Sequence, residues 1–179
     1  MKTENVKNIF GVDTAYYLSG VDDGDEPYCS ISPSFKWEET YSKNLILERL
    51  KISGIINAKY DVLNNIYVVS RFESGRVNEL RIEISSSEDD ETKSVSLYGN
   101  NIRFVIRTAD NKSILKSIWF DLTFDPDDNI IISGKGYGHG VGLCQWGTVR
   151  QSRLGRNFKQ ILNHYFPGTK ISYFSNDKI

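Results

Sequence analysis

Glycine alternates with other residues over positions 134 to 142 of this chain, within the segment GKGYGHGVGLCQWG that ends at Gly147. If the backbone stays extended, all five glycines lie on one face, and the opposite face presents Lys135, Tyr137, His139 and Val141. Glycine costs roughly 0.5 to 1 kcal/mol against alanine in a strand. The run therefore predicts that something approaches this backbone closely, or that several residues need a positive φ. The alternative is an ordinary glycine-rich bend between a strand and a helix.

Familiar nucleotide and metal patterns do not fit this segment. The third glycine of a G-x-G-x-x-G fingerprint is missing, because the required offsets fall on His139, Val141 or Leu143. No G-x-x-x-x-G-K-[S/T] loop is present either. A zinc site would draw on His139, Cys144 and His164, whose spacing is weak beside established zinc motifs. We therefore expect no cofactor and no metal.

A thiol enzyme is a concrete alternative for the same segment. His139 and Cys144 could act as base and nucleophile, with Cys144 at the start of a helix whose dipole lowers the thiol pKa. The competing interpretation of Cys144 is a small thiol packed under the helix. Cys29 and Cys144 are the two cysteines of the chain, and a single bridge, two buried thiols or a reactive thiol all remain open.

Length, composition and charge indicate one globular domain. The chain has 179 residues, of which 39% are hydrophobic and 25% charged, enough apolar surface for one core. Lysine and arginine number 22 against 23 acids, so the balance lacks the basic excess of a dedicated nucleic-acid binder. No apolar run approaches the ~18 residues that a membrane helix needs. We expect no nucleic-acid partner and find no signal or membrane segment.

The first half of the chain predicts one helix and one hairpin. The first 35 residues are rich in Gly, Asp, Ser and Pro, and little regular structure is expected there. Leucines near helical spacing, preceded by Glu38 and Glu39 where a helix dipole favours acids, predict a helix over 38–50. β-branched runs at 65–72 and 76–84 flank a Glu-Ser-Gly turn and predict a hairpin.

The second half continues with strands and short helices. The charged segment 85–93 is expected to be a solvated loop, and 95–98 a strand. Apolar residues at 102, 105 and 106, behind Asn100 as N-cap, predict a helix. The remaining predictions are a hairpin of 117–124 with 129–133 around an Asp-Pro-Asp-Asp turn, helices over 144–154 and from Asn157 to Phe166, and a last strand over 170–174. Together they predict an α+β fold of mostly antiparallel hairpins with several short helices, in which a glycine-rich loop leads into a C-terminal helix pair.

Several segments resemble one known family. GYGHGVGLCQWG at 136–147, continued by NFKQILNHYFPGT at 157–169, is similar to the C-terminal signature of the stage II sporulation protein D/LytB family, which contains peptidoglycan lytic transglycosylases and amidase enhancers. The resemblance extends upstream through NVKNIFGVDTAYYLSGVDD, FKWEETYSKNLILERL, ESGRVNELRIE and GNNIRFVIR, and so covers most of the chain. In that family the last of these segments is a short helix and FKWEETYSKNLILERL a strand followed by a helix.

The resemblance implies a cell-wall function but leaves catalysis open. The family's catalytic glutamate lies on a helix upstream of everything matched here, so residues 1–179 are expected to be a single domain forming the C-terminal part of a longer protein. Cys144 stands where the family usually has serine, which argues against an essential thiol. The full-length protein is expected to face the cell wall outside the cytoplasm, and a role in sporulation is what the resemblance suggests. Its partners would be peptidoglycan glycan strands and a cell-wall amidase.

Lytic transglycosylases need one carboxyl that serves as acid and then base in an apolar pocket. The acids of this chain stand mainly in polar clusters, and none resembles such a group. The chain can instead supply the wall of a glycan cleft, with His139 and Gln145 in supporting catalytic roles. The expected substrate-binding residues are Gly136, Tyr137, Gly138, Gly140 and Trp146. Tyr137 and Trp146 could alternatively be core residues, and His139 could only brace the loop.

The resemblance therefore predicts the peptidoglycan-binding part of a lytic transglycosylase that acts on glycan strands between N-acetylmuramic acid and N-acetylglucosamine. The first alternative is a non-catalytic glycan-binding or amidase-enhancing module. The second is a hydrolase that uses Cys144 and His139.

Overall fold

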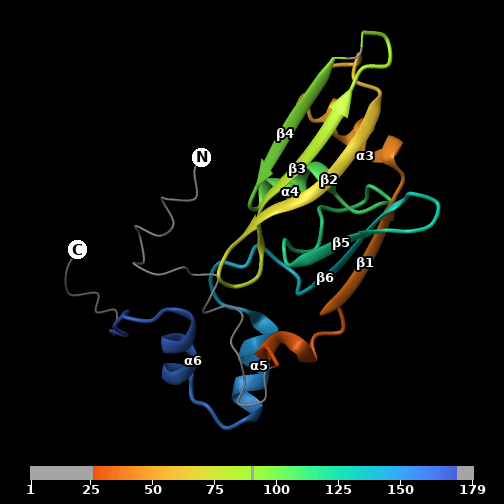
Figure 1. Cartoon of the computed structure of the whole chain (residues 1–179). Helices are drawn as coiled ribbons and strands as arrows, with labels where there is room; N and C mark the ends of the chain where they lie inside the picture. The colour runs from red at the N-terminus through yellow and green to blue at the C-terminus, as the bar shows by residue number, and fades with distance from the viewer. Residues whose placement is uncertain (1–25, 90, 173–179) are drawn as a thin grey trace.

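The computed structural model describes residues 26–89 and 91–172. Over these ranges the chain forms two three-stranded antiparallel sheets and short helices, which confirms the predicted α+β class (Figure 1). One sheet has the strand order β1-β6-β5 and the other β2-β3-β4. In the described ranges no helix has the length and apolar character needed to cross a membrane.

The first sheet combines a strand from the beginning of the described chain with a hairpin from its second half. β1 (Lys36–Tyr41) pairs antiparallel with β6 (Ile130–Lys135), which pairs in turn with β5 (Phe120–Phe124). The β5–β6 hairpin confirms the prediction. Its turn is closed by Asp125, whose Oδ1 accepts the backbone N–H groups of Asp127 at 2.9 Å and Asn129 at 2.8 Å.

The second sheet is a meander of β2 (Val62–Arg71), β3 (Val77–Ser85) and β4 (Thr92–Tyr98). The predicted hairpin is confirmed as β2–β3, and the charged connection expected over 85–93 is found between β3 and β4. From Leu80 onward every second residue of β3 is buried, with Leu80, Ile82 and Ile84 at 0% exposure. This period of two points one face of the sheet at the core.

The predicted helix over 38–50 begins too early. α3 spans Lys43–Ile52, whereas Glu38 and Glu39 lie on β1. The N-cap is Ser42, whose Oγ accepts the N–H of Leu45 at 3.2 Å. Pairing with β6, almost a hundred residues further along the chain, makes this stretch a strand, and local spacing carries no information about that partner.

The helix predicted behind Asn100 is confirmed as α4 (Asn101–Ile106). Asn100 holds the N-cap position, but its side chain makes no capping bond and instead donates from Nδ2 to the backbone oxygen of His139 at 3.1 Å. α4 packs against α3 and β4 (Figure 1). This contact fixes Asn100 beside the glycine run.

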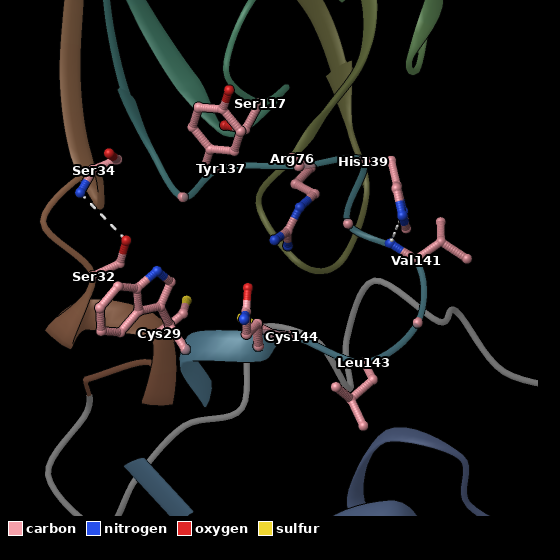
Figure 2. A pocket seen from close by; sticks show the side chains of 16 residues that line it. Cys29, Ser32, Ser34, Arg76, Ser117, Tyr137, His139, Val141, Leu143 and Cys144 are labelled. Carbon is pink, nitrogen blue, oxygen red and sulfur yellow. Dashed lines mark hydrogen bonds between the residues drawn. The ribbon is translucent and has the colours of Figure 1, made fainter. Parts of the chain in front are cut away.

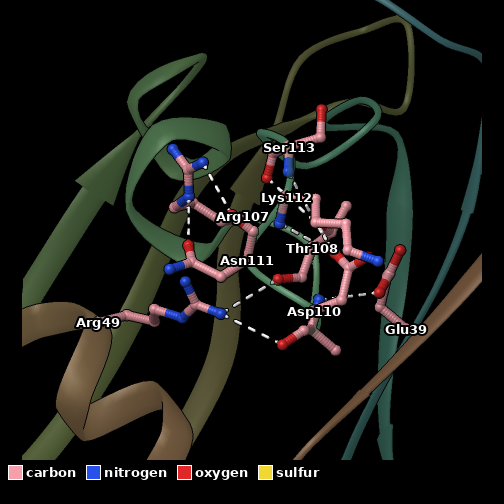
Figure 3. A network of polar contacts seen from close by, with 9 residues as sticks. Glu39, Arg49, Arg107, Thr108, Asp110, Asn111, Lys112 and Ser113 are labelled. Atoms are coloured by element: carbon pink, nitrogen blue, oxygen red, sulfur yellow. Dashed lines mark hydrogen bonds and ion pairs between the residues drawn. The ribbon is translucent and has the colours of Figure 1, made fainter.

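A polar network holds the loop that follows α4 (Figure 3). Buried Arg49 of α3 donates from Nη2 to the carbonyl oxygens of Thr108 at 3.2 Å and Ala109 at 3.3 Å. From the other side, Glu39 of β1 accepts the N–H of Ala109 at 2.9 Å. Because these groups come from a helix and a strand on either side of it, the loop links α3 to the first sheet.

One hydrophobic core joins both sheets with α3 and α4. Its buried members include Tyr41, Ile46, Leu80, Ile102 and Ile130, each at 0% exposure, and they come from five different elements. A smaller cluster forms around Ile161 and Tyr165, with Cys144 and Phe166 packed against it. The small cluster lies at the end of the molecule that carries the C-terminal helices (Figure 1).

The C-terminal helix pair is confirmed as α5 (Gln145–Arg153) and α6 (Phe158–Tyr165). Asn157 and Gln160 form a capping box at the start of α6. α5 packs on η1 (Tyr28–Ile31), a single 3-10 turn within the described part of the N-terminal segment. Of the strand expected over 170–174, residues 170–172 are not in a strand, and 173–174 lie outside the described residues, as do residues 1–25.

Candidate functional site

The glycine run is a loop between β6 and α5, so the extended arrangement considered from the sequence holds only as far as Lys135. Gly134 lies on β6. The other four glycines have positive φ angles, +73° at Gly136, +130° at Gly138, +76° at Gly140 and +95° at Gly142. Such angles are disfavoured for residues with a β-carbon. The expectation that several residues need a positive φ is therefore confirmed.

Gly134 shows the other expected reason for glycine, a close approach. A β-carbon at this position would lie 2.1 Å from Cζ2 of Trp37, well inside van der Waals contact. The Trp37 ring packs across the strand there and donates from Nε1 to the backbone oxygen of Gly136 at 3.0 Å. Trp37 thus fixes the point at which the chain leaves the sheet.

Hydrogen bonds from three other segments shape the rest of the loop. Gly136 N–H donates to Phe35 O at 2.6 Å, and Gly138 N–H donates to Lys116 O at 2.7 Å. The His139 oxygen accepts from Asn100, as described above. Within the loop, the N–H of Val141 donates to Nδ1 of His139 at 2.8 Å. The loop is therefore built into the fold by defined contacts.

The loop, α5 and η1 enclose an open cleft of about 470 Å³ (Figure 2). All seven residues expected at the site line it: Gly136, Tyr137, Gly138, His139, Gly140, Gln145 and Trp146. Residues that sequence reasoning did not place there also line it: Cys29, Ser32, Ser34, Arg76 and Ser117. The fold thus gathers the candidate residues of one short segment around a concavity. It adds side chains from η1 and the residues after it, from the segment before β5 and from the β2–β3 turn.

Two aromatic rings are exposed in this cleft. Tyr137 is 67% exposed and Trp146 is 40% exposed, so neither is a core residue. Tyr137 stands on the loop and Trp146 on the first turn of α5. Exposed rings beside hydrogen-bonding groups offer stacking faces to a ligand.

His139 and Gln145 are the polar side chains expected to act here, and both are exposed. Because Nδ1 of His139 accepts the Val141 N–H, the neutral ring carries its proton on Nε2 and can donate from that atom. The bond to Val141 shows that His139 braces its own loop. Gln145, the first residue of α5, offers both an amide donor and an acceptor.

Arg76 brings a cation to the cleft and is 7% exposed. Its guanidinium lies 5.0 Å from the ring centroid of Trp119, a cation–π contact. A β-carbon at Gly140 would lie 2.6 Å from its Nε, so the loop backbone passes directly over this side chain. In the sequence Arg76 only follows the Glu-Ser-Gly turn of a hairpin, a setting that gives no signal for a site.

Comparison with known proteins places the chain in a family. The family model for a domain of unknown function, DUF8618, matches residues 22–142. The chain belongs to this family. The match includes β1 to β6 and the glycine loop as far as Gly142.

Individual relatives match over shorter shares of their own length. An uncharacterized protein of Brachyspira hyodysenteriae is 30% identical over 177 residues, which cover 94% of this chain and 40% of that protein. The amidase enhancer of Bacillus subtilis is 35% identical over 69 residues, 38% of this chain and 10% of the enhancer. Stage II sporulation protein D of Bacillus subtilis is 38% identical over 45 residues, 25% of this chain and 13% of that protein. The chain spans less than half the length of these curated relatives. The partial matches support a likeness to the stage II sporulation protein D/LytB family.

Carboxyl groups do not reach the cleft from the described residues, because its lining contains neither Asp nor Glu. Where a carboxyl pKa departs from its ordinary value in the described ranges, it is lowered. Hydrogen bonds are the largest cause in each case: Asp61, Glu79, Asp89, Glu91, Asp110 and Asp125. A general acid needs the opposite shift. These six carboxyl groups are therefore ionised at neutral pH.

The described residues do not assemble a zinc site from His139, Cys144 and His164, and they contain no group of three or more potential metal ligands. The ring of His164 packs edge-on against Tyr28 and Tyr165, at centroid distances of 5.4 Å and 4.8 Å. Burial lowers its pKa. His164 therefore joins α6 to η1 as a packing residue.

The His139/Cys144 dyad is not formed either. Figure 2 shows the two side chains apart, with His139 turned toward Val141. Cys144 is the N-cap of α5, and its sulfur accepts the N–H of Gly147 at 3.4 Å. Cys29 of η1 interacts with it electrostatically. Within the described residues, the hydrogen bonds of His139 and Cys144 thus go to Val141 and Gly147, and the two side chains do not bond to each other.

Proposed function

We propose that the cleft between the glycine loop, α5 and η1 binds peptidoglycan glycan strands. The observation that carries this proposal is the grouping of exposed Tyr137 and Trp146 with hydrogen-bonding side chains around a preformed concavity. Partial similarity to an amidase enhancer and to stage II sporulation protein D suggests a cell-wall-related function. We place the full-length protein outside the cytoplasm on the same ground.

Each part of the cleft has a role in this binding. Sugar rings present apolar faces that stack on Tyr137 and Trp146, and hydroxyl and acetamido edges that pair with His139 Nε2 and the Gln145 amide. The glycines at 136, 138 and 142 leave open space where a β-carbon would otherwise stand. A flat glycan can thus approach the loop backbone directly.

Catalysis by a lytic transglycosylase requires more than this cleft supplies. The muramyl 6-hydroxyl attacks its own anomeric carbon, and one carboxyl protonates the leaving oxygen and then accepts the hydroxyl proton. Because the nucleophile belongs to the substrate, the second carboxylate of ordinary glycosidases is not needed. In our proposal, His139 and Gln145 orient the glycan and the acid comes from elsewhere in the longer protein.

An amidase-enhancing module that binds glycan without cleaving it is the second candidate. The absence of Asp and Glu from the described cleft lining favours it, as does the similarity to the amidase enhancer of Bacillus subtilis. The two candidates differ in products. Incubation of purified peptidoglycan with the chain should yield 1,6-anhydromuropeptides only if the chain cleaves, and mass spectrometry detects them.

Sedimentation with purified peptidoglycan tests the binding proposal. Trp146→Ala and Tyr137→Ala should each weaken binding about tenfold or more, as expected for truncating a central aromatic contact. Phe104→Ala is the matched control, because Phe104 is 58% exposed on α4 and does not line the cleft. Peptide-free glycan strands should compete with the sacculi. Equal binding of all four proteins would overturn the proposal.

A further inference from the structure

Cys29 and Cys144 line the same cleft although they stand far apart in the sequence (Figure 2). Cys29 lies on η1 and Cys144 caps the N-terminus of α5, and these two elements pack on each other. Arg150 of α5 strengthens the contact by donating from Nη1 to Ser30 Oγ at 2.7 Å. Both thiols are half-buried and reduced in this structure. The fold therefore holds two thiols together at a wall of the cleft.

The surroundings of the two sulfurs are unequal. The Cys144 sulfur accepts the N–H of Gly147 at 3.4 Å and lies at the start of α5, where backbone N–H groups face it. Its interaction with Cys29, followed by these backbone groups, outweighs burial and lowers the pKa of Cys144. The same interaction, together with burial, raises the pKa of Cys29. Cys144 is therefore the more acidic thiol of the two.

We propose that Cys144 and Cys29 form a thiol–disulfide exchange pair whose oxidised state is a reversible bridge between α5 and η1. Packing of η1 on α5 brings the two thiols to the same part of the cleft, and the helix N-terminus marks Cys144 as the attacking sulfur. Cys29 is the resolving residue because it is the other thiol that lines this cleft. The pair goes beyond glycan binding and does not depend on it.

The reaction balances with a low-molecular-weight disulfide as oxidant. The Cys144 thiolate attacks one sulfur of the oxidant, forms a mixed disulfide and expels a thiolate. Cys29 then loses its proton to that leaving thiolate, and its sulfur attacks the Cys144 sulfur and expels the second thiolate. The two cysteines lose two electrons to the oxidant, which becomes one thiol and one thiolate. A thiol reductant reverses both steps.

The bridge would act directly on the cleft. Cys144 precedes Gln145 and Trp146 on α5, whereas Cys29 lies on η1 and Ser32 directly follows η1. A covalent link between the sulfurs fixes the position of α5 relative to η1. It also removes the ionisable thiol that interacts with Arg76.

Peptide mapping of the full chain in glutathione buffers tests the proposal. Oxidised glutathione should produce one intramolecular Cys29–Cys144 crosslink that dithiothreitol reverses. Cys29→Ser should instead trap glutathione on Cys144, and Cys144→Ser should acquire it far more slowly on Cys29. Glutathione stably attached to both cysteines of the wild type, or disulfide-linked dimers in place of the crosslink, would overturn the proposal.

Alkylation of the reduced wild type gives a second measurement that needs no variant. Because Cys144 is the more acidic thiol and lies at a helix N-terminus, iodoacetamide should label it about tenfold or more faster than Cys29 at about pH 7. As pH rises, the Cys144 rate should reach its plateau at a lower pH than the Cys29 rate. Equal labelling rates for the two cysteines would contradict the assigned roles. Peptidoglycan sedimentation under dithiothreitol keeps this question separate from glycan binding.

Discussion

Substitution of Gly134 by alanine should destabilise the whole protein through a single methyl group. The added β-carbon would lie 2.1 Å from Cζ2 and 2.4 Å from Cε2 of Trp37, whereas carbon atoms in contact are about 3.5 to 4.0 Å apart. The indole ring must therefore move by more than about 1 Å. Trp37 is 7% exposed and packs edge-on against Phe120, so the surrounding core resists that movement.

Two costs add in this variant. Overpacking a well-packed core costs about 1 to 3 kcal/mol. Separating Trp37 Nε1 from the Gly136 oxygen leaves a buried donor unpaired and costs about 1 to 3 kcal/mol more. The expected loss is about 2 to 6 kcal/mol in unfolding free energy, or about 4 to 24 °C in melting temperature for a domain of this size.

Urea unfolding of a double-mutant cycle tests the cause as well as the size. Trp37→Leu removes the ring that the methyl group would meet, so Gly134→Ala should cost much less in that background than in the wild type. Gly54→Ala is a control in which the new β-carbon meets nothing within 4 Å and only the backbone φ of +68° is penalised. A Gly134→Ala protein within 0.5 kcal/mol of the wild type, or a strictly additive double mutant, would refute the reasoning.

Three further outcomes follow from the geometry. Gly140→Ala should lose more stability and more peptidoglycan binding than Gly138→Ala, because both glycines have a positive φ but only the Gly140 β-carbon would meet Arg76. Lys135→Ala should have a smaller effect than either glycine variant. Equal melting temperatures and equal binding for all three variants would contradict this order. The Cys144→Ser variant should have the melting temperature and the peptidoglycan binding of the wild type, because serine is a good N-cap for α5. An enzymatic activity that is lost in this variant would instead favour a thiol enzyme. Hydrogen bonds from Asn129 and Asp127 lower the pKa of Asp125 in the folded protein. The Asp125 carboxylate therefore stabilises the fold at pH values above the pKa it has in the unfolded chain. This stabilisation is lost as the pH falls through the lower pKa of the folded state. The melting-temperature gap between wild type and Asp125→Ala should therefore narrow below about pH 4, and a constant gap would be inconsistent with this shift.

Local sequence signals were sufficient for the elements whose partners are close in the chain. The β2–β3 and β5–β6 hairpins follow from alternation and from turn residues such as Gly75 and Asp125. The start of α6 follows from Asn157, whose capping box depends on residues three apart. In these cases the information and the interaction lie in the same short window.

Interactions between distant segments account for what local reasoning missed. β1 becomes a strand because it pairs with β6, and Asn100 turns from its helix to the His139 oxygen because α4 lies beside the loop. Cys29 and Cys144 line one cleft because η1 packs against α5. The glycine run marked the candidate site, but only the fold shows which other segments complete the cleft.

Chemical-shift mapping with peptide-free glycan strands tests the central claim most directly. The isotope-labelled full chain, kept reduced, would be titrated with strands of alternating N-acetylglucosamine and N-acetylmuramic acid. Saturable shifts should concentrate in the loop from Gly136 to Leu143, in the first turn of α5 and in η1, and Trp146→Ala should weaken them. Absence of saturable shifts, or shifts centred on the β2-β3-β4 sheet, would contradict a glycan-binding cleft at this loop.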